Sequence, residues 1–317
     1  MDLDTSSPFS RAFDYASDCI GLRFQNPLYR ITERFTGSKF RRSIATVKAF
    51  GQQIVSNAQQ PQSGLEGDDG NLDPQSEYGN LIDSLMQAFD DSSIVADAAL
   101  NMLSAGRDTT AQSLTWAFYL LIRHPSINQR LRQEIVAAFP SEALSHGVCM
   151  IDLADLQPVK LPYTTAVFYE ALRLYPPVPF EIKQCQLNVT LPDGTFLPSG
   201  SIVVWCIWAM NRSADIWGQT SPNLDTFHPE RWLKQDRFVS KSAFEFPVFN
   251  GGPRSCLGKK MAELIAAYVM VNMVRQFDLE EVISGKQPER ERRSQNSLTL
   301  PMQDGLPCRV REVRTIS

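Results

Sequence analysis

Most of the chain carries apolar residues at the three- and four-residue spacing of amphipathic helices. Residues 9–58 show mixed apolar faces that predict two or three helices. The longest pattern runs from Ser92 to Arg123 and stops at His124-Pro125, because the residue before a proline disfavours helical backbone. This stretch is apolar on more than one face, which predicts a long helix threading the centre of a large domain.

Three further helices are predicted in the second half of the chain. Ser126 precedes Gln129 at the spacing of a capping box, which indicates a helix that begins at Ser126. Residues 162–175 predict another helix, which ends at Pro176-Pro177. Residues 257–277 predict a final helix that is apolar on most sides.

Other segments lack the helical spacing. Residues 183–208 alternate apolar and polar positions and contain two turns, Pro-Asp-Gly and Pro-Ser-Gly, so they predict short strands or hairpins. Residues 298–310 predict a terminal hairpin with Asp304-Gly305 in its turn. Residues 59–80 are rich in Gly, Pro, Gln and Asp and predict a flexible loop. We therefore expect a mainly α fold with minor β structure, in one domain that covers residues 1–317.

The charge balance narrows the classes of partner. Among 317 residues there are 31 basic and 35 acidic side chains, which give a net charge of −4 and argue against a nucleic-acid-binding protein. The longest apolar run, Ile202–Met210, is far shorter than the roughly 20 residues that span a bilayer. The first residues contain neither the basic nor the apolar region of a signal peptide. The chain as given therefore shows no anchor and no signal.

Cysteine and histidine usage limits the metal chemistry. The six cysteines lie far apart without a CxxC pair, which indicates a reducing compartment rather than a disulfide framework. The three histidines, at 124, 146 and 228, are not spaced as zinc ligands with one another or with a cysteine. Any metal chemistry must therefore use a single cysteine.

Cys256 stands out among the six cysteines because of its surroundings. It lies in residues 249–258, where glycines and a proline force a tight loop just before the last predicted helix. Helix N-termini stabilise a thiolate, and a thiolate so placed is a suitable axial ligand for haem iron. The alternative is a structural cysteine in a glycine-rich loop, but the pattern F-x-x-G-x-R-x-C-x-G favours the functional interpretation.

With this pattern the chain resembles the cytochrome P450 family of haem-thiolate monooxygenases. The resemblance implies haem b (iron protoporphyrin IX) as the cofactor and Cys256 as the proximal iron ligand. It further implies that Phe249 packs beside the sulfur and that Arg254 meets a haem propionate. Gly252 and Gly258 would let the backbone lie close to the porphyrin and the thiolate.

Further motifs occur in the order expected for the same family. Glu170 and Arg173 form an E-x-x-R motif, and the resemblance implies that they join Arg231 of P-E-R-W in a structural three-way ion pair. At the position of Lys183 the family often carries an arginine that reaches a propionate. A lysine keeps the charge but lacks the two-pronged guanidinium of arginine. Two interpretations therefore stay open: a contact with haem, and a solvated lysine at a strand edge.

The long predicted helix contains Ala105-Gly106-Arg107-Asp108-Thr109-Thr110. The resemblance implies that Thr109, through ordered water, helps deliver protons to bound oxygen, with Asp108 serving the relay. The alternative is a polar patch inside a helix, with threonine bonded back to a carbonyl. Candidate substrate-facing residues are Met102, Ala105 and Leu300.

The segment around Cys256 is basic although the whole chain is acidic. Between Glu230 and Lys260 seven basic residues face three acidic ones, a local net charge of +4. This segment is either a solvated loop with internal ion pairs or a face that attracts an acidic flavoprotein. The resemblance implies the second: NADPH–cytochrome P450 reductase would dock near Lys259 and Lys260 and supply electrons from NADPH.

Residues 100–121 most resemble the fungal and plant fatty-acid and alkane hydroxylase branches, whose members sit on the endoplasmic reticulum membrane facing the cytoplasm. This implies oxygen insertion into a small hydrophobic, long-chain aliphatic substrate. Two alternatives stay open: a tailoring oxidase of secondary metabolism, and a truncated, non-catalytic remnant. The resemblance also implies the C-terminal portion of one large domain, truncated at its N-terminus, so we expect this chain to bind haem poorly and a longer product to be the active form.

Overall fold

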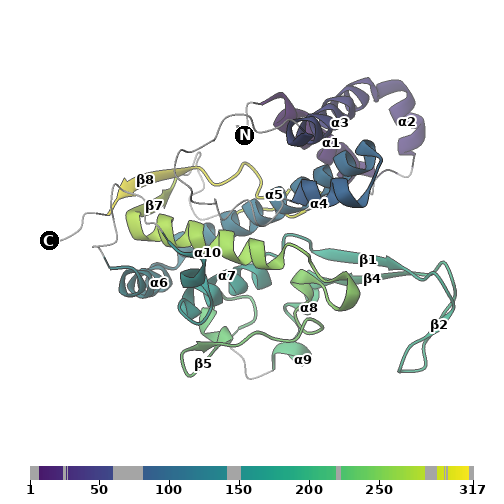
Figure 1. Ribbon diagram of the computed structural model, residues 1–317. Helices are drawn as coiled ribbons and strands as arrows, with labels where there is room; N and C mark the ends of the chain where they lie inside the picture. Colours follow the sequence, from purple (N-terminus) through teal and green to yellow (C-terminus); the bar gives the residue numbers. More distant parts are fainter. Residues whose placement is uncertain are drawn as a thin grey trace. The chain divides into compact units, whose positions relative to one another are not determined.

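The computed structural model describes most of the chain, and its contacts divide it into two compact units (Figure 1). One unit comprises residues 1–107 with 296–298, and the other comprises residues 108–295 with 299–317. The mainly α fold with minor β structure is confirmed. The described residues are 7–23, 26, 28–59, 81–140, 151–218, 223–282, 291–295, 297 and 299–313.

The regular secondary structure among the described residues of the first unit consists of helices alone. Phe9 stacks on Phe50 with ring centroids 4.0 Å apart, which joins the first helix to the third. A Cβ built on Gly51 would lie 2.7 Å from Leu100 Cδ1, so glycine permits a close approach of the helices that carry these two residues. The helices are α1 (Pro8–Arg23), α2 (Tyr29–Thr36), α3 (Ser38–Gln59), α4 (Leu81–Ala88) and the first half of α5 (Ser92–Arg123).

The core of the second unit surrounds α7 (Pro162–Leu174). From Tyr163 to Leu174 every residue of α7 except Thr165 is buried, so this helix contacts protein on all sides. Helices α6 (Pro125–Ala138) and α10 (Lys259–Gln276) pack against it, as does the 3-10 helix η4 (Pro229–Trp232). The remaining short helices are η3 (Leu153–Leu156), α8 (Ile207–Met210), α9 (Ala214–Trp217), η5 (Pro247–Phe249) and η6 (Gly252–Arg254).

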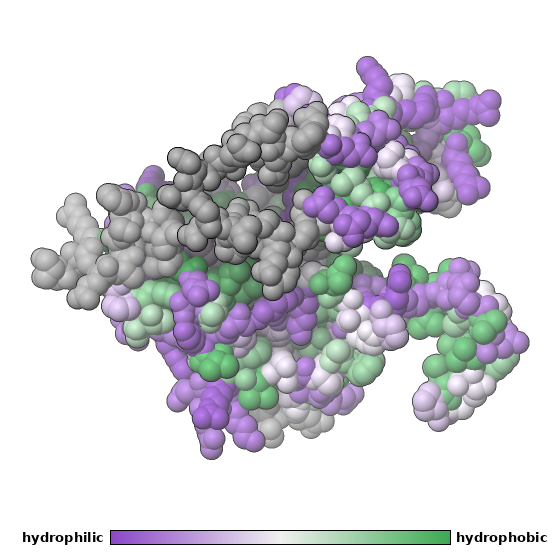
Figure 2. Space-filling model, in the orientation of Figure 1, coloured by the Kyte–Doolittle hydropathy of each residue, from purple (hydrophilic) through white to green (hydrophobic). Residues whose placement is uncertain are grey.

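The described strands form four antiparallel two-stranded sheets, all in the second unit. Strand β1 (Phe180–Gln184) pairs with β4 (Ile202–Cys206), and the chain between them forms a hairpin from β2 (Val189–Thr190) and β3 (Phe196–Leu197). Together they form the finger on the right of Figure 1, which carries apolar patches in Figure 2. The other two pairs are β5 (Leu233–Lys234) with β6 (Arg237–Phe238), and β7 (Phe277–Glu281) with β8 (Cys308–Glu312).

The start predicted at Ser126 for the helix after His124-Pro125 is wrong. Helix α6 begins at Pro125, with His124 at the N-cap, rather than at a Ser126–Gln129 capping box. Proline favours the first helical position because its fixed φ suits the helix and its missing N–H would have no partner there. The proline that ends α5 therefore also begins α6.

The predicted terminal hairpin is wrong in its pairing. Asp304 and Gly305 do adopt left-handed backbone, with φ of 62° and 63°. The strand that follows them, however, pairs with β7 instead of folding back on the residues before the turn. Five residues of β7 pair with five of β8, and Glu280 adds exposed ion pairs across the sheet, with its carboxylate 2.8 Å from Arg311 Nη2 and 3.5 Å from Arg309 Nη1.

Several expectations concern isolated residues. The described cysteines, at 19, 185, 206, 256 and 308, are all free thiols, and the described part of the chain contains no cluster suited to a metal ion. No described helix combines the length and apolarity needed to cross a membrane. Some predictions lie outside the described residues: the loop at 59–80 (of which only Gln59 is described), His146, Cys149 and Leu298.

Glu134 of α6 caps the first turn of α7, and this contact gives a stability prediction. Its carboxylate accepts the backbone N–H groups of Tyr163 and Thr164 and the Thr164 hydroxyl, each at 2.7 Å. We expect Glu134→Ala to lower the free energy of unfolding by about 2 kcal/mol in urea titrations, because it leaves helix N–H groups without an acceptor. Gln133→Ala, on the exposed neighbour, is the control. Equal stability of the two variants would contradict the capping role.

Candidate functional site

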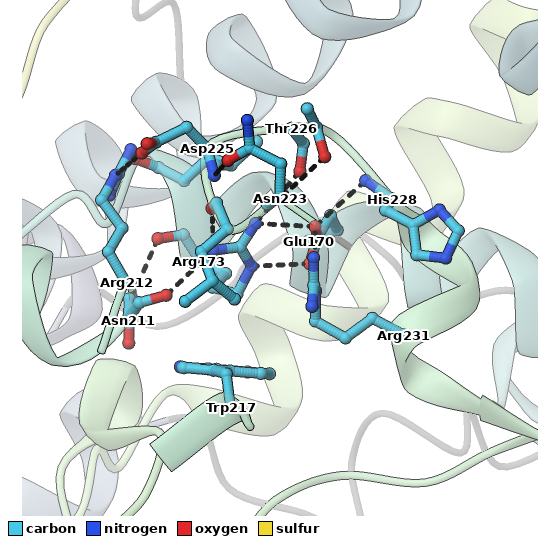
Figure 3. A network of polar contacts seen from close by, with 12 residues as sticks. Glu170, Arg173, Asn211, Arg212, Trp217, Asn223, Asp225, Thr226, His228 and Arg231 are labelled. Atoms are coloured by element: carbon cyan, nitrogen blue, oxygen red, sulfur yellow. Dashed lines mark hydrogen bonds and ion pairs between the residues drawn. The ribbon is translucent and has the colours of Figure 1, made fainter. Parts of the chain in front are cut away.

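A buried ion pair lies at the centre of the second unit. Glu170 and Arg173 are both on α7, and their side chains have no exposed surface. Arg173 Nε donates to Glu170 Oε2 at 2.9 Å and Arg173 Nη2 donates to Oε1 at 2.8 Å, which makes the contact bidentate (Figure 3). Positions i and i+3 share one helix face, so the E-x-x-R spacing itself brings the two groups together.

Arg173 also binds the irregular chain that follows α8. Its Nη1 donates to the carbonyl oxygens of Asn211 at 2.9 Å and Leu224 at 2.7 Å, and its Nη2 donates to that of Thr226 at 3.2 Å. In return Asn211 Nδ2 donates to the Arg173 carbonyl at 3.1 Å. A single guanidinium thereby binds backbone carbonyls on both sides of α9 (Figure 3).

Glu170 holds η4 through three further donors. The His228 backbone N–H lies 3.1 Å from Oε1, Arg231 Nε lies 3.4 Å from the same oxygen, and the Trp232 indole N–H donates to Oε2 at 2.8 Å. Burial lowers the pKa of Arg231, while the Glu170 carboxylate opposes that shift. Sequence analysis missed the Trp232 donor, although a buried tryptophan needs an acceptor for its N–H.

The cysteine loop is closed by its own backbone. The Cys256 N–H donates to the Phe249 carbonyl at 2.7 Å, and the Ser255 N–H donates to Gly252 at 3.1 Å. Asn250 has a φ of 56°, which non-glycine residues seldom adopt. Its side chain donates to Glu181 Oε1 of β1 at 2.8 Å, so a contact from another element supports the strained position.

The outer side of this loop is open. Cys256 is exposed and Leu257 is 80% exposed. A Cβ built on Gly252 or Gly258 would meet no described atom within 4 Å. Arg254 is exposed and makes no hydrogen bond or ion pair with the described residues. The loop therefore exposes a thiol, an apolar side chain and a cation at successive or nearby positions.

The predicted residues of α5 fall in both units. Met102, which is 39% exposed, and Ala105 lie in the first unit, whereas Asp108 and Thr109 begin the second. The Thr109 carbonyl accepts a hydrogen bond from the Ser113 hydroxyl at 2.7 Å.

The segment around Leu300 is fixed to α5. The Leu300 carbonyl accepts from Trp116 Nε1 at 2.9 Å, and the Leu300 N–H donates to the Pro177 carbonyl at 2.9 Å. Gln112 Nε2 donates to the Thr299 hydroxyl at 2.8 Å. This brings the C-terminal segment beside the same helix that carries Thr109 in the second unit.

The predicted cationic residues are partly engaged. Lys183 Nζ lies 3.9 Å from Glu181 Oε2 and 5.8 Å from the centroid of the Trp205 ring, and the lysine side chain is 44% exposed. Lys259 Nζ lies 4.0 Å from Glu263 Oε1, and Lys260 contacts the side-chain oxygen of Gln157. Both α10 lysines remain exposed.

Comparison with known proteins identifies the family. A sequence model of the cytochrome P450 family matches residues 7–308. The chain belongs to the cytochrome P450 family.

Similar proteins come from plants and fungi. Cytochrome P450 86B1 of Arabidopsis thaliana is 33% identical over 312 residues, which cover 94% of this chain and 54% of that protein. Cytochrome P450 CYP94D108 of Paris polyphylla is 33% identical over 311 residues, 96% and 58% of the two chains. Cytochrome P450 52A1 of Candida tropicalis is 33% identical over 313 residues, 96% and 54%. The chain thus spans about half the length of the curated relatives it matches.

Membership of the cytochrome P450 family implies a haem cofactor. The open side of the cysteine loop fits such a group. A thiol supplies the soft ligand for iron, and the two glycines leave room for a flat ring against the backbone. Arg254 offers a guanidinium for a carboxylate.

The buried, bidentate ion pair between Glu170 and Arg173 gives a second prediction. Arg173→Lys keeps the charge but loses two parallel bonds to Glu170 and several bonds to backbone carbonyls. We expect the free energy of unfolding to fall by about 3 kcal/mol, measured by urea titration. The matched substitution Arg311→Lys, on exposed β8, should change it by less than about 0.5 kcal/mol. Similar losses of unfolding free energy in the two variants would contradict a central role for the Glu170–Arg173 ion pair.

Proposed function

We propose that the protein containing these residues is a haem-thiolate monooxygenase. It would insert one atom of O2 into a hydrophobic, long-chain aliphatic substrate, with electrons from NADPH delivered by a flavoprotein reductase. The observation that carries the proposal is the loop of residues 249–258, which presents an exposed Cys256 from a backbone held at both ends. Family membership supports the same conclusion.

When bound, the haem supplies the chemistry of oxygen activation. The protein would supply the thiolate of Cys256 as iron ligand and the cation of Arg254 for a propionate. Lys183 could add a second cation, although its ion pair with Glu181 competes for it. Phe249, the half-buried first residue of the loop, would pack beside the sulfur and limit the access of water to it.

Asp108 and Thr109 would manage protons. A carboxylic acid and a hydroxyl at successive positions of α5 can pass a proton between solvent and a water held by the threonine. The Thr109 carbonyl is held by Ser113, which fixes the backbone of the next helical turn. These side chains hold and move protons, whereas the Glu170–Arg173 pair acts only on structure.

The substrate class rests on the resemblance of α5 to aliphatic hydroxylases, with Met102, Ala105 and Leu300 as the residues expected to contact substrate. Leu300 is suited to this role because its backbone is fixed by Trp116 and Pro177. A fixed backbone holds an apolar side chain at a defined place, which favours selection of substrates by shape. A tailoring oxidase of secondary metabolism would use the same machinery, so turnover of fatty acids against polycyclic substrates separates the two.

Cys256 gives the direct test of the proposal. We expect the chain incubated with haem, reductant and carbon monoxide to show the absorption band of thiolate ligation, even if loading is incomplete. Cys256→Ala should abolish this band, because residues 249–258 contain no other cysteine to serve as the ligand. Cys308→Ala, at the start of β8, is the control and should retain it. A band that persists in Cys256→Ala would refute the assignment of the ligand.

Lys260 gives a test of the reductase face. We expect Lys260→Glu to weaken the affinity of the chain for a diflavin reductase several-fold at low ionic strength, because charge attraction steers the encounter. The difference should shrink at high salt, as titrated by fluorescence anisotropy. Lys48→Glu makes the same charge change on exposed α3 and is the control. An equal loss of affinity in both variants would indicate an effect of net charge and contradict a local docking face.

A further inference from the structure

Tyr169 and Glu263 join α7 to α10 through one short hydrogen bond. Tyr169 is 3% exposed, and its hydroxyl donates to Glu263 Oε1 at 2.5 Å. Burial raises the pKa of the Tyr169 phenol, and the neighbouring carboxylate raises it further, so the phenol keeps its proton and stays a donor. A hydrogen bond from a neutral donor to a carboxylate is stronger than one between neutral groups.

The Tyr169 ring contacts the arm of the chain that enters the cysteine loop. Its centroid lies 5.7 Å from that of Phe246 and 6.2 Å from that of Phe249, the first residue of the loop. It lies 5.3 Å from the Trp232 ring, whose indole N–H donates to Glu170. Tyr169 therefore connects the buried Glu170–Arg173 pair, through Trp232, to the start of the cysteine loop.

Glu263 contacts the arm that leaves the loop. It lies one helical turn after Lys259, the first residue of α10, and the Lys259 ammonium lies 4.0 Å from its Oε1. The same ammonium lies 5.4 Å from the centroid of the Phe249 ring. One carboxylate thus contacts both a side chain that packs on the entering arm and a side chain from the leaving arm.

We propose that Glu263 is a positioning residue for the haem-ligand loop, because it accepts the Tyr169 hydrogen bond and pairs with Lys259. In this way it sets the first turn of α10 against α7, and so fixes the two arms between which Cys256 is held. The role of the loop as an iron ligand rests on the function proposed above, whereas the fixing of its arms does not.

The effect should be local to the loop. Further along α10, Ala266, Met270 and Val271 are buried in the core, so the helix stays packed without Glu263. The first turn of α10 buries no side chain in the core: Met261 is 55% exposed, and Lys260 makes only an exposed contact with Gln157. Loss of Glu263 should therefore free the start of α10 and the loop while the remainder of the helix keeps its place.

Hydrogen exchange on the chain without haem tests this directly. We expect Glu263→Ala to speed exchange in residues 249–258 about fivefold, the consequence of losing roughly 1 kcal/mol of local stability. Glu263→Gln keeps an oxygen acceptor for Tyr169 and should stay within about twofold of the native rate. Glu280→Ala removes a glutamate that pairs with Arg311 on the β7–β8 sheet and is the control. Should Glu263→Ala fail to fold, Tyr169→Phe keeps the ring, removes only the donor, and carries the same expectation.

A second measurement concerns the ligand itself. In haem-loaded protein we expect Glu263→Ala to lower the share of the carbon monoxide complex that shows thiolate ligation, with recovery in Glu263→Gln. Unchanged exchange in the loop of Glu263→Ala, or a glutamine variant no better than alanine, would overturn the positioning role. A native chain that shows no thiolate band, together with the expected exchange pattern, would instead count against the proposed function and leave the role of Glu263 standing.

Discussion

The buried ion pair between Glu170 and Arg173 is the interaction on which the second unit depends. Both side chains are shielded from solvent, and an unpaired charge in such a place costs several kcal/mol. Their two parallel bonds satisfy only part of each group, so the remaining guanidinium protons and carboxylate lone pairs need other partners. Segments distant in sequence supply them, and the pair therefore dictates the path of an otherwise irregular chain.

Contacts between side chains, rather than backbone hydrogen bonds of a sheet, connect the Glu170–Arg173 pair to the cysteine loop. Arg173 fixes the carbonyls after α8, and Glu170 fixes η4. The Trp232 ring then packs 4.8 Å from that of Phe246, which lies just before the loop. The described strands form only two-stranded sheets, so no large sheet positions these segments. The hydrogen bonds that the buried Glu170–Arg173 pair requires thus position the chain after α8 and η4.

Local patterns could be read from the sequence, whereas contacts between distant residues could not. The spacing of apolar residues predicted a helix over Ser92–Arg123, and α5 has these bounds, because helical periodicity is a local property. The partner of β8 is β7, some thirty residues earlier in the chain, and no local signal shows a pairing at that distance. Motif spacing likewise singled out Cys256 and Glu170. The hydrogen bond from Tyr169 to Glu263 spans 94 positions and becomes visible only when α7 and α10 are packed together.

The loop around Cys256 combines an exposed tip with buried supports. Left-handed backbone at Asn250 and at Gly252 is unfavourable or glycine-specific, and such conformations persist only where the surroundings determine them. Here Glu181 holds the Asn250 side chain, and the Phe249 carbonyl holds the Cys256 N–H. One hydrogen bond within the loop and one to β1 thus restrain the backbone on either side of Cys256. A thiol presented on such a backbone loses little conformational entropy on coordination, which favours binding of a rigid, flat cofactor over contacts that require the loop to rearrange.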